Sequence, residues 1–296
     1  MLYIDPAWID TYEGNFRHLY QQKQSVLSPY IQRGTMEGKK KRFTYIGKAD
    51  MVERQGKNTD TKWQDLEFYN RWISRRVFDY ALLIDEFDDI KSALTDPTSS
   101  AIQGALMAAN RRKDRVIVEA FGATAYTGEN AEVAVPFPSG NILDVQLGSA
   151  STKENQPLNL AKLKELAARM DEGDVPETDR RILVCTQRQL NALLDDDHVS
   201  SADFNSIKAL VNGTIDSFYG FKFVKYNGLP LENDVRTCWA FSSSSMQLAV
   251  SLDTRIKGPV EIPQKHFQPG FEVTMALDAV RLYDAGVYQV PCKEVK

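Results

Sequence analysis

The sequence is poor in the residues that most often build metal, redox and disulfide sites. Its 296 residues include only three cysteines and three histidines: Cys185, Cys238, Cys292, His18, His198 and His266. The cysteines are far apart and odd in number, which predicts neither a disulfide framework nor a zinc site. None of the histidines has a ligand partner at a metal-site spacing. We therefore expect no metal, no cofactor and a reducing compartment.

Long apolar runs and signal-peptide features are missing as well. No run approaches the roughly 20 apolar residues that cross a bilayer. The first ten residues, MLYIDPAWID, are acidic and aromatic, whereas a signal peptide is basic and then apolar. The sequence therefore predicts a soluble protein that is made in a cytoplasm and has no membrane partner.

Motifs of the common enzyme classes are also absent. The chain has no GxxxxGKS/T, GxGxxG, GxSxG or HExxH. The acidic run at 85–89 could supply an acid–base pair, but it has no conspicuous partner, so a solvated run before a helix fits it better. We expect a protein that is not an enzyme and has no catalytic residues. An enzyme with an unrecognised pocket in 181–261 is the alternative.

Size and charge allow a large core and argue against nucleic acid as a general ligand. The chain is 43% hydrophobic and 26% charged. A chain of this length buries roughly three-quarters of its unfolded surface, so it needs no disulfide or metal to hold it. Its 36 basic and 40 acidic residues give a net charge of −4, which does not indicate a general nucleic-acid binder.

Apolar periodicity predicts a helix at the N-terminus. Six apolar residues, four of them aromatic, recur at helical spacing over 6–28: Trp8, Ile9, Tyr12, Phe16, Leu19 and Tyr20. A terminal helix with such an apolar face must dock on something.

Other helices and strands follow from the same patterns. The longest predicted helix spans 97–123 and opens at Asp96-Pro97. Another helix begins after Thr186, with Gln189 as its capping-box partner. Further helices are expected at 158–170 and 202–211. Strands are expected at 42–45, 66–84, 133–138, 142–147, 181–185, 221–225, 236–241, 246–252 and 271–290, with a polar bend at 255–265.

The segment 31–62 has a distinct composition. It carries nine Lys or Arg against four Asp or Glu, contains four glycines, and has a turn-like stretch at 56–60. With the flanking strands it predicts a long two-stranded arm with little core of its own. An isolated hairpin is marginal in water, so the arm would gain order on a neighbouring subunit. The basic run at 39–42 could touch nucleic acid or pair with the acidic run of a neighbour.

Three stretches, in their order along the chain, carry a resemblance to a known family. They are RVFDYALLIDEFDDIKSALTDPTSSAIQGALMAANRRKDRVIVEAFGATAYTG at 76–128, GTIDSFYGFKFVKYNGLP at 213–230, and MALDAVRLYDAGVYQV at 275–290. In the second, three glycines punctuate a short strand of alternating aromatic and basic residues. The chain resembles the tailed-phage major capsid proteins of the Hong Kong 97 type over nearly its whole length.

The resemblance implies an α+β fold of several parts. These are an N-terminal arm at 1–30, an extended β-hairpin loop at 31–84, a peripheral domain at 85–180 and 262–296 whose spine helix is 97–123, and an axial domain at 181–261. The chain begins directly at the arm, so scaffolding, if needed, would be a separate protein.

The function implied is structural. Copies of the chain would form pentamers and hexamers and close into an icosahedral head, in the virion, around double-stranded DNA bound non-specifically. Synthesis is expected in the host bacterial cytoplasm, and the portal, scaffolding and decoration proteins are further expected partners. The alternative within the fold is an encapsulin-like cellular compartment.

The residues expected to contact a neighbouring subunit lie in the extended loop. Aromatic side chains dominate interface hot spots, and basic ones could add charge pairs. The candidates are Tyr45, Trp63, Phe68, Trp72, Phe78, Lys39, Lys40, Lys41 and Arg42.

Overall fold

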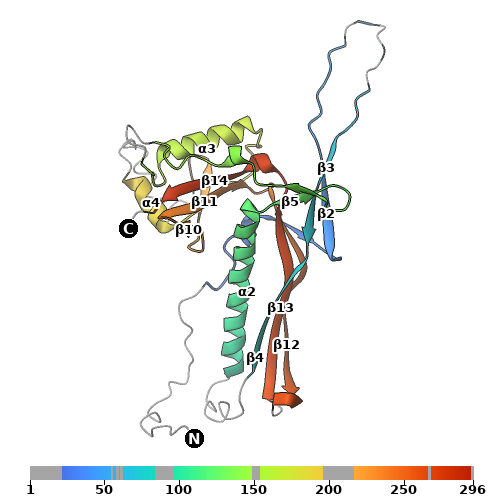
Figure 1. Cartoon of the computed structure of the whole chain (residues 1–296), viewed down its shortest axis with the longest axis vertical. Helices are drawn as coiled ribbons and strands as arrows, with labels where there is room; N and C mark the ends of the chain where they lie inside the picture. The colour runs from blue at the N-terminus through green and yellow to red at the C-terminus, as the bar shows by residue number, and fades with distance from the viewer. Residues whose placement is uncertain are drawn as a thin grey trace. The chain divides into compact units, whose positions relative to one another are not determined.

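The structure is a computed structural model, and its helices and strands are labelled in Figure 1. It describes residues 22–54, 56–57, 60, 63–83, 97–148, 154–195, 217–265 and 268–294. Three α-helices lie in these ranges: α2 (Pro97–Gly122), α3 (Leu160–Glu172) and α4 (Gln187–Leu194).

The strands form three sheets. The first has the order β1 (Gln32–Thr35), β12 (Met246–Ile262), β13 (Gln268–Arg281), β4 (Arg76–Leu83). The second has the order β10 (Leu231–Glu232), β11 (Val235–Ser242), β7 (Arg181–Cys185), β9 (Phe221–Lys225), β8 (Ser217–Phe218), and β14 (Val287–Lys293) also pairs with β11. The third has the order β2 (Lys40–Ile46), β3 (Phe68–Ser74), β5 (Ala125–Thr127), β6 (Val133–Val135).

The chain divides into two units, and the division falls inside α2, β12 and β13. The first unit comprises Met1–Ser25, Arg76–Lys113 and Leu252–Ala276; the second comprises Val26–Arg75, Asp114–Ser251 and Leu277–Lys296.

In the first unit, α2 lies along three long strands, β12, β13 and β4 (Figure 1). Apolar side chains such as Phe271 and Val273 of β13 are buried there. Polar contacts flank them: the Lys113 ammonium lies 2.7 Å from an Asp253 carboxylate oxygen. The Arg112 guanidinium lies 4.6 Å from the centre of the Phe78 ring. The helix is thus fixed to its strands by apolar packing and by contacts at its edges.

The core of the second unit is the six-stranded sheet. Four of the five β7 residues, from Ile182 to Cys185, are buried. Strand β9 runs parallel to β7, and β11 runs antiparallel on its other side. A strand buried on both faces reads as a continuous apolar run, which explains the sequence Ile-Leu-Val-Cys.

Helix α3 begins where a polar side chain caps it. The Asn159 side-chain oxygen accepts the Lys162 backbone N–H at 2.9 Å. The Lys162 ammonium is buried and donates to the carbonyl oxygens of Gln156 and Pro291, each at 2.8 Å. Burial lowers the pKa of this amine, although nearby thiols oppose the shift.

The end of α2 packs against the six-stranded sheet in the second unit. The Phe121 ring stacks on Trp239 at 5.5 Å and lies 4.9 Å from Phe241. A Cβ at Gly122 would come within 3.0 Å of the Trp239 ring, so the absence of a side chain permits this approach. The helix therefore ends on a cluster of aromatic rings, which bury much apolar surface.

A fully buried arginine, Arg281, is the last residue of β13. The Arg281 guanidinium donates to the carbonyl oxygens of Phe121 at 2.8 Å, Ala123 at 3.1 Å and Pro136 at 3.4 Å. It also pairs with Asp284. The Asp284 carboxylate accepts a hydrogen bond of 3.0 Å from a second arginine, Arg71. These partners together satisfy the buried charge of Arg281. Because they belong to different segments, the network joins α2, β3 and the chain after β13.

The C-terminal residues are held by a second buried ion pair. The Arg236 guanidinium donates two hydrogen bonds to the Glu294 carboxylate, at 2.9 and 3.1 Å. The Gln189 side-chain amide donates to the same carboxylate at 3.2 Å. Burial opposes the charged form of Glu294, but these hydrogen bonds outweigh it and lower the pKa of the carboxyl.

Several predicted elements are confirmed. The helix expected at 97–123 is α2, and that at 158–170 is α3, displaced by two residues at each end. The strands expected at 181–185 and 221–225 are β7 and β9. The expected helices at 202–211 and over most of 6–28 lie outside the described residues, but residues 22–27 are not helical.

Other predictions are wrong. The strand expected over 66–84 breaks at Arg75, and β3 and β4 pair in different sheets. The predicted polar bend at 255–265 is mostly strand β12, which carries charged side chains such as Lys257 on its exposed side. No strand forms at 142–147.

The predicted capping box of α4 is also wrong. Thr186 precedes the helix, but its hydroxyl caps nothing and lacks a hydrogen-bond partner. Gln189 instead accepts the Leu158 backbone N–H at 3.0 Å and donates to the Lys293 carbonyl oxygen at 3.0 Å. Gln189 thus binds segments that are distant in the sequence, and it does not cap the helix as the local pattern predicted.

We expect Arg281→Met to lower the free energy of unfolding by about 3 kcal/mol or more, because it leaves buried carbonyls without their donor. Urea unfolding followed by circular dichroism measures this. Lys257→Met is the matched control, since its pair with Glu272 is half exposed and should cost less than about 1 kcal/mol. Equal costs for the two variants would contradict the role assigned to the network.

Glu294→Gln should make the chain less stable at neutral pH, by about 2 kcal/mol, the scale of hydrogen bonds to a charged group. The pKa of Glu294 is lower in the folded chain than the ordinary value of 4.5. Its contribution is therefore complete above that value and is lost as the pH falls through the folded pKa. Urea unfolding at pH 7 and below pH 4.5 should show the two proteins converging in acid. A pH-independent difference would count against the ion pair.

Candidate interaction surface

The described residues include an extended and exposed hairpin surface. Within them, no group of three or more His, Cys, Asp or Glu side chains is placed to hold a metal ion. The three cysteines are free and buried. No helix in this part of the chain is both long enough and apolar enough to cross a bilayer.

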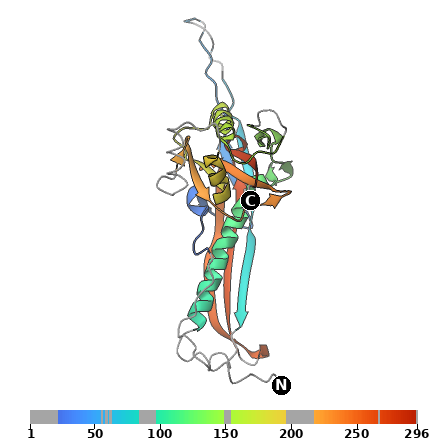
Figure 2. The same cartoon turned by 90° about the vertical axis from the view of Figure 1, so that its left-hand side faces the viewer.

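The hairpin of β2 and β3 supplies the most exposed apolar side chains. Its ladder runs from Lys40 opposite Ser74 to Ile46 opposite Phe68. The ladder closes with a hydrogen bond of 2.8 Å from the Gly47 N–H to the Glu67 carbonyl oxygen. Beyond this bond the described residues 48–54 and 63–66 extend away from the sheet (Figures 1 and 2). The sheet thus fixes the base of the hairpin.

Two predicted contact residues lie at the loop and are free to meet a partner. Trp63 is 90% exposed and Phe68 is 64% exposed. Ile46, paired with Phe68 across the ladder, and Leu66 are also exposed. We call Ile46, Trp63, Leu66 and Phe68 the loop apolar face. The aromatic anchors predicted from the sequence did not include Ile46 or Leu66, nor Met51 and Val52 of the same loop, which are also exposed. The pairing of β2 with β3 places Ile46 beside Phe68.

Tyr45, also predicted as an anchor, packs largely within its own chain. Its ring stacks on Tyr69 at 5.7 Å and meets Tyr283 edge-on at 4.8 Å. Burial raises the pKa of the Tyr45 hydroxyl, while the Arg71 guanidinium opposes this shift. The cluster joins the base of the hairpin to the residues that follow β13.

The other two aromatic candidates have partners within the subunit too. The Trp72 indole N–H donates to the Gly128 carbonyl oxygen at 2.7 Å. Phe78 belongs to β4, in the other unit, and lies beneath Arg76 and Arg112. Of the five aromatic candidates, the structure therefore brings only Trp63 and Phe68 into one exposed region.

The basic candidates do not form one patch. Lys39, Lys40 and Arg42 are exposed, and the Arg42 guanidinium lies 5.9 Å from the centre of the Trp72 ring. Lys41 points to the other face of β2, where its ammonium donates to the Thr35 carbonyl oxygen at 2.5 Å. Alternation along the strand thus divides the run between two faces. The acidic run at 85–89 and all three histidines lie outside the described residues.

The chain is similar to proteins of one known family and to several solved structures. The profile of the family described as "Phage capsid protein" matches residues 4–294. No curated protein matches the chain.

Solved structures show the same fold. The capsid protein of cyanophage Pam1 is similar with a TM-score of 0.73 and 12% identity, and the match covers 99% of each chain. The capsid of Helicobacter pylori bacteriophage KHP30 has a TM-score of 0.72 and 11% identity, over 100% of this chain and 99% of that one. The SrpI encapsulin of Synechococcus elongatus has a TM-score of 0.62 and 10% identity, over 100% and 98%. The predicted fold class is thus confirmed.

Two tryptophans of the hairpin should respond differently to truncation. Trp63→Ala should change the free energy of unfolding by less than about 0.5 kcal/mol, because the side chain is almost fully exposed. Trp72→Ala should cost about 2 kcal/mol, because it removes packing and leaves the Gly128 carbonyl without its donor. Urea unfolding of dilute protein measures both. A stability loss for Trp63→Ala equal to that of Trp72→Ala would show that the loop is folded onto its own subunit.

Proposed function

Because the chain belongs to the phage capsid protein family, we propose that its copies bind one another through the loop apolar face and close into the shell of a phage head. The chain is a major capsid protein with the Hong Kong 97-type fold. Its role is structural, as the sequence predicted. The mode of contact and the contents of the shell form the proposal.

The exposure of the loop apolar face supports this mode of contact. The four side chains of this face, two at the end of the ladder and two in the loop, are exposed, as are Met51 and Val52 of the same loop. Leaving them in water is unfavourable, and burying each against a neighbour would contribute roughly 1.5–3 kcal/mol. A loop that contacts a different surface on the next copy makes a head-to-tail interface, and such interfaces close into rings. The resemblance favours rings of five and six.

The expected domains remain part of the proposal. The extended loop at 31–84 is the segment that lies across a neighbour, and the axial domain at 181–261 faces the ring axis. The exposed residues Lys39, Lys40 and Arg42 would add charge pairs or contact packaged double-stranded DNA, in both cases with a strong dependence on salt. The portal, scaffolding and decoration proteins are the further partners we propose, and the host bacterial cytoplasm is the proposed place of synthesis.

A cellular compartment is the second candidate, because an encapsulin has the same fold. The phage capsid family match over 4–294 favours the viral head. The contents of purified particles decide between the two: nuclease-protected DNA supports the head, and a co-purifying enzyme supports the compartment.

Removing the loop should abolish assembly without unfolding the subunit. The variant replaces residues 48–66 by Asn-Gly, so that Gly47 and Glu67 flank a two-residue hairpin turn of the favoured type. The 2.8 Å bond between these two residues can then persist. We expect a folded subunit that forms no stable shells under conditions where the natural chain does, as seen by electron microscopy and sedimentation.

Two further variants control this experiment. Trp63→Ala with Phe68→Ala keeps the loop length and removes half of the loop apolar face, so its shells should dissociate at a lower urea concentration. Lys48→Ala changes an exposed residue of the same loop that pairs with Asp174, and it should leave assembly nearly unchanged. Shells of normal stability from the shortened chain would refute the loop assignment.

A further inference from the structure

The sheet of β2, β3, β5 and β6 buries one of its two faces. Ile73 of β3 and Ala125 of β5 belong to a buried apolar cluster with Val280. Phe43 and Val135 pack against the same cluster. Because side chains alternate along a strand, the residues between these belong to the opposite face of the sheet.

A row of paired residues crosses that opposite face. Arg42 lies opposite Trp72, and Trp72 lies opposite Tyr126. Tyr126 is paired in turn with Ala134. Lys40 lies two positions before Arg42 on the same face, and both are exposed. We call Lys40, Arg42, Trp72, Tyr126 and Ala134 the outer sheet face.

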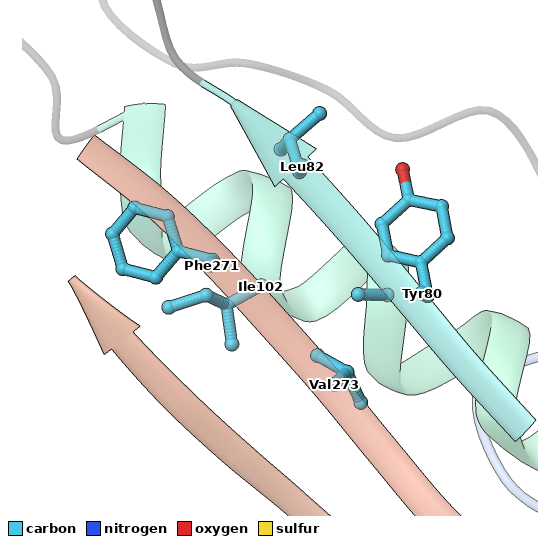
Figure 3. A pocket seen from close by; sticks show the side chains of 6 residues that line it. Tyr80, Leu82, Ile102, Phe271 and Val273 are labelled. Atoms are coloured by element: carbon cyan, nitrogen blue, oxygen red, sulfur yellow. The ribbon is translucent and has the colours of Figure 1, made fainter. Parts of the chain in front are cut away.

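The outer sheet face stays largely in contact with water. In the first unit, by contrast, α2 packs on a sheet: Figure 3 shows Ile102 of the helix beside Phe271 and Val273 of β13. Within the described residues Tyr126 is 47% exposed, and Arg42 and Ala134 are exposed as well. Tyr, Trp and Arg are the residue types enriched at the centres of protein interfaces. The composition of this face therefore indicates a contact with another protein chain.

The outer sheet face continues into the loop apolar face. The pair of Ile46 and Phe68 follows the pair of Arg42 and Trp72 by four positions on the same ladder. The two pairs therefore share one face, about 13 Å apart. The outer sheet face measures at most roughly 14 Å by 20 Å, which is less than half of the roughly 800 Å² that each partner contributes to a stable interface. It is thus large enough for one part of an interface, and the loop apolar face supplies a second part.

The densest group of carboxylates in the described residues lies at the end of α3. Five of the nine residues at 171–179 are Asp or Glu, and we call this segment the acidic turn. The Val175 side chain is buried, and its backbone N–H donates to the Met170 carbonyl oxygen at 3.1 Å. Glu172 and Glu177 are exposed. The fold thus holds the turn in place before any partner arrives, which lowers the entropic cost of binding.

The acidic turn lies on the side of the buried face of the sheet. A Cβ at Gly173 would be 3.3 Å from the Ala285 Cβ, so the turn adjoins the segment that follows β13. Tyr283 of that segment packs on Tyr45, whose side chain shares the buried face with Phe43. A contact between the acidic turn and the outer sheet face therefore needs two copies. It joins two different patches, as a head-to-tail interface does.

We propose that the outer sheet face of one copy binds the acidic turn of the next copy, with Lys40 and Arg42 against the carboxylates of Glu172 and Glu177. Opposite charges on two fixed surfaces set the register of such a contact. A protein partner fits better than DNA, because apolar side chains share this face with only two cations. The proposal rests on the proposed function, since it names a second contact between the copies that form the shell.

Photo-cross-linking in assembled particles tests the contact. Tyr126→p-benzoylphenylalanine keeps a ring on the outer sheet face and inserts into nearby C–H bonds when irradiated. Trypsin releases the acidic turn as the peptide 170–180, to which we expect the cross-links. The same probe at Tyr80, which is also 47% exposed but belongs to β4, should give at least about tenfold fewer links to this peptide.

Isotope labelling identifies the source of the acidic turn. In shells assembled from nitrogen-14 and nitrogen-15 copies, links between peptides of different isotopes should be found. Links within one isotope only, links to another peptide or links to packaged DNA would overturn the contact. If the natural chain formed no shells, the proposed function would fail and this contact with it. If shells form and the links lie elsewhere, only the contact fails.

Reversal of the charges tests the same contact without a probe. Lys40→Glu with Arg42→Glu should lower the yield of shells by at least about tenfold, because like charges would face each other. Glu172→Lys with Glu177→Arg should do the same. All four substitutions together should restore the yield to within about threefold of the natural chain. Loss in both pairs without restoration would count against the pairing.

A matched reversal separates this contact from an effect of net charge. Lys164 and Lys293 are exposed and lie outside both surfaces. Lys164→Glu with Lys293→Glu changes the net charge as much as the reversal of Lys40 and Arg42, and it should leave the yield within about threefold. An equal loss would show that net charge controls assembly and would overturn the assignment. Circular dichroism of dilute subunits checks folding, and the cross-links decide the contact whether or not these variants fold.

Discussion

The buried guanidinium of Arg281 needs hydrogen-bond acceptors and a counter-charge, and several segments of the second unit supply them. Its acceptors belong to the end of α2, to the chain before and after the short strand pair β5–β6, and to Asp284. An unpaired charge in this position would cost several kcal/mol, so these segments are stable only together. Asp284 also binds Arg71 of β3, which ties the base of the projecting hairpin to the same network.

The hairpin therefore combines a base that is bonded within the subunit with exposed apolar side chains beyond it. Tyr45 and Trp72 are used inside the subunit, in ring contacts and in a hydrogen bond. Trp63 and Phe68 have no such role and stay in water. This separation lets residues of one hairpin serve two purposes: one set holds the fold, and the other is available to a neighbour. It also allows the assembly contacts to change without loss of the subunit's stability.

Long periodic elements could be predicted from the sequence, but the contacts between distant segments could not. Helix α2 and strands β7 and β9 follow from apolar pattern and from Pro and Gly at their ends. The separate pairing of β3 and β4 did not follow, because both carry the same aromatic and β-branched residues, and only their partners β2 and β13 distinguish them. Local rules likewise assigned Gln189 to a helix cap, whereas the structure uses it to hold Leu158 and the C-terminal residues. At the candidate surface, residue type predicted aromatic anchors. Tyr45 and Trp72 are used within the subunit because they contact Tyr283 and Gly128, which lie far away in the sequence.

The three thiols of the chain are all enclosed by the six-stranded sheet, on β7, β11 and β14. Burial raises the pKa of Cys185, which further suppresses the reactive thiolate. A cysteine introduced at an exposed position would therefore be the one thiol of the native particle that maleimide reagents reach. Dyes, peptides or drugs could be attached there at one defined point per copy, with the natural cysteines left in place.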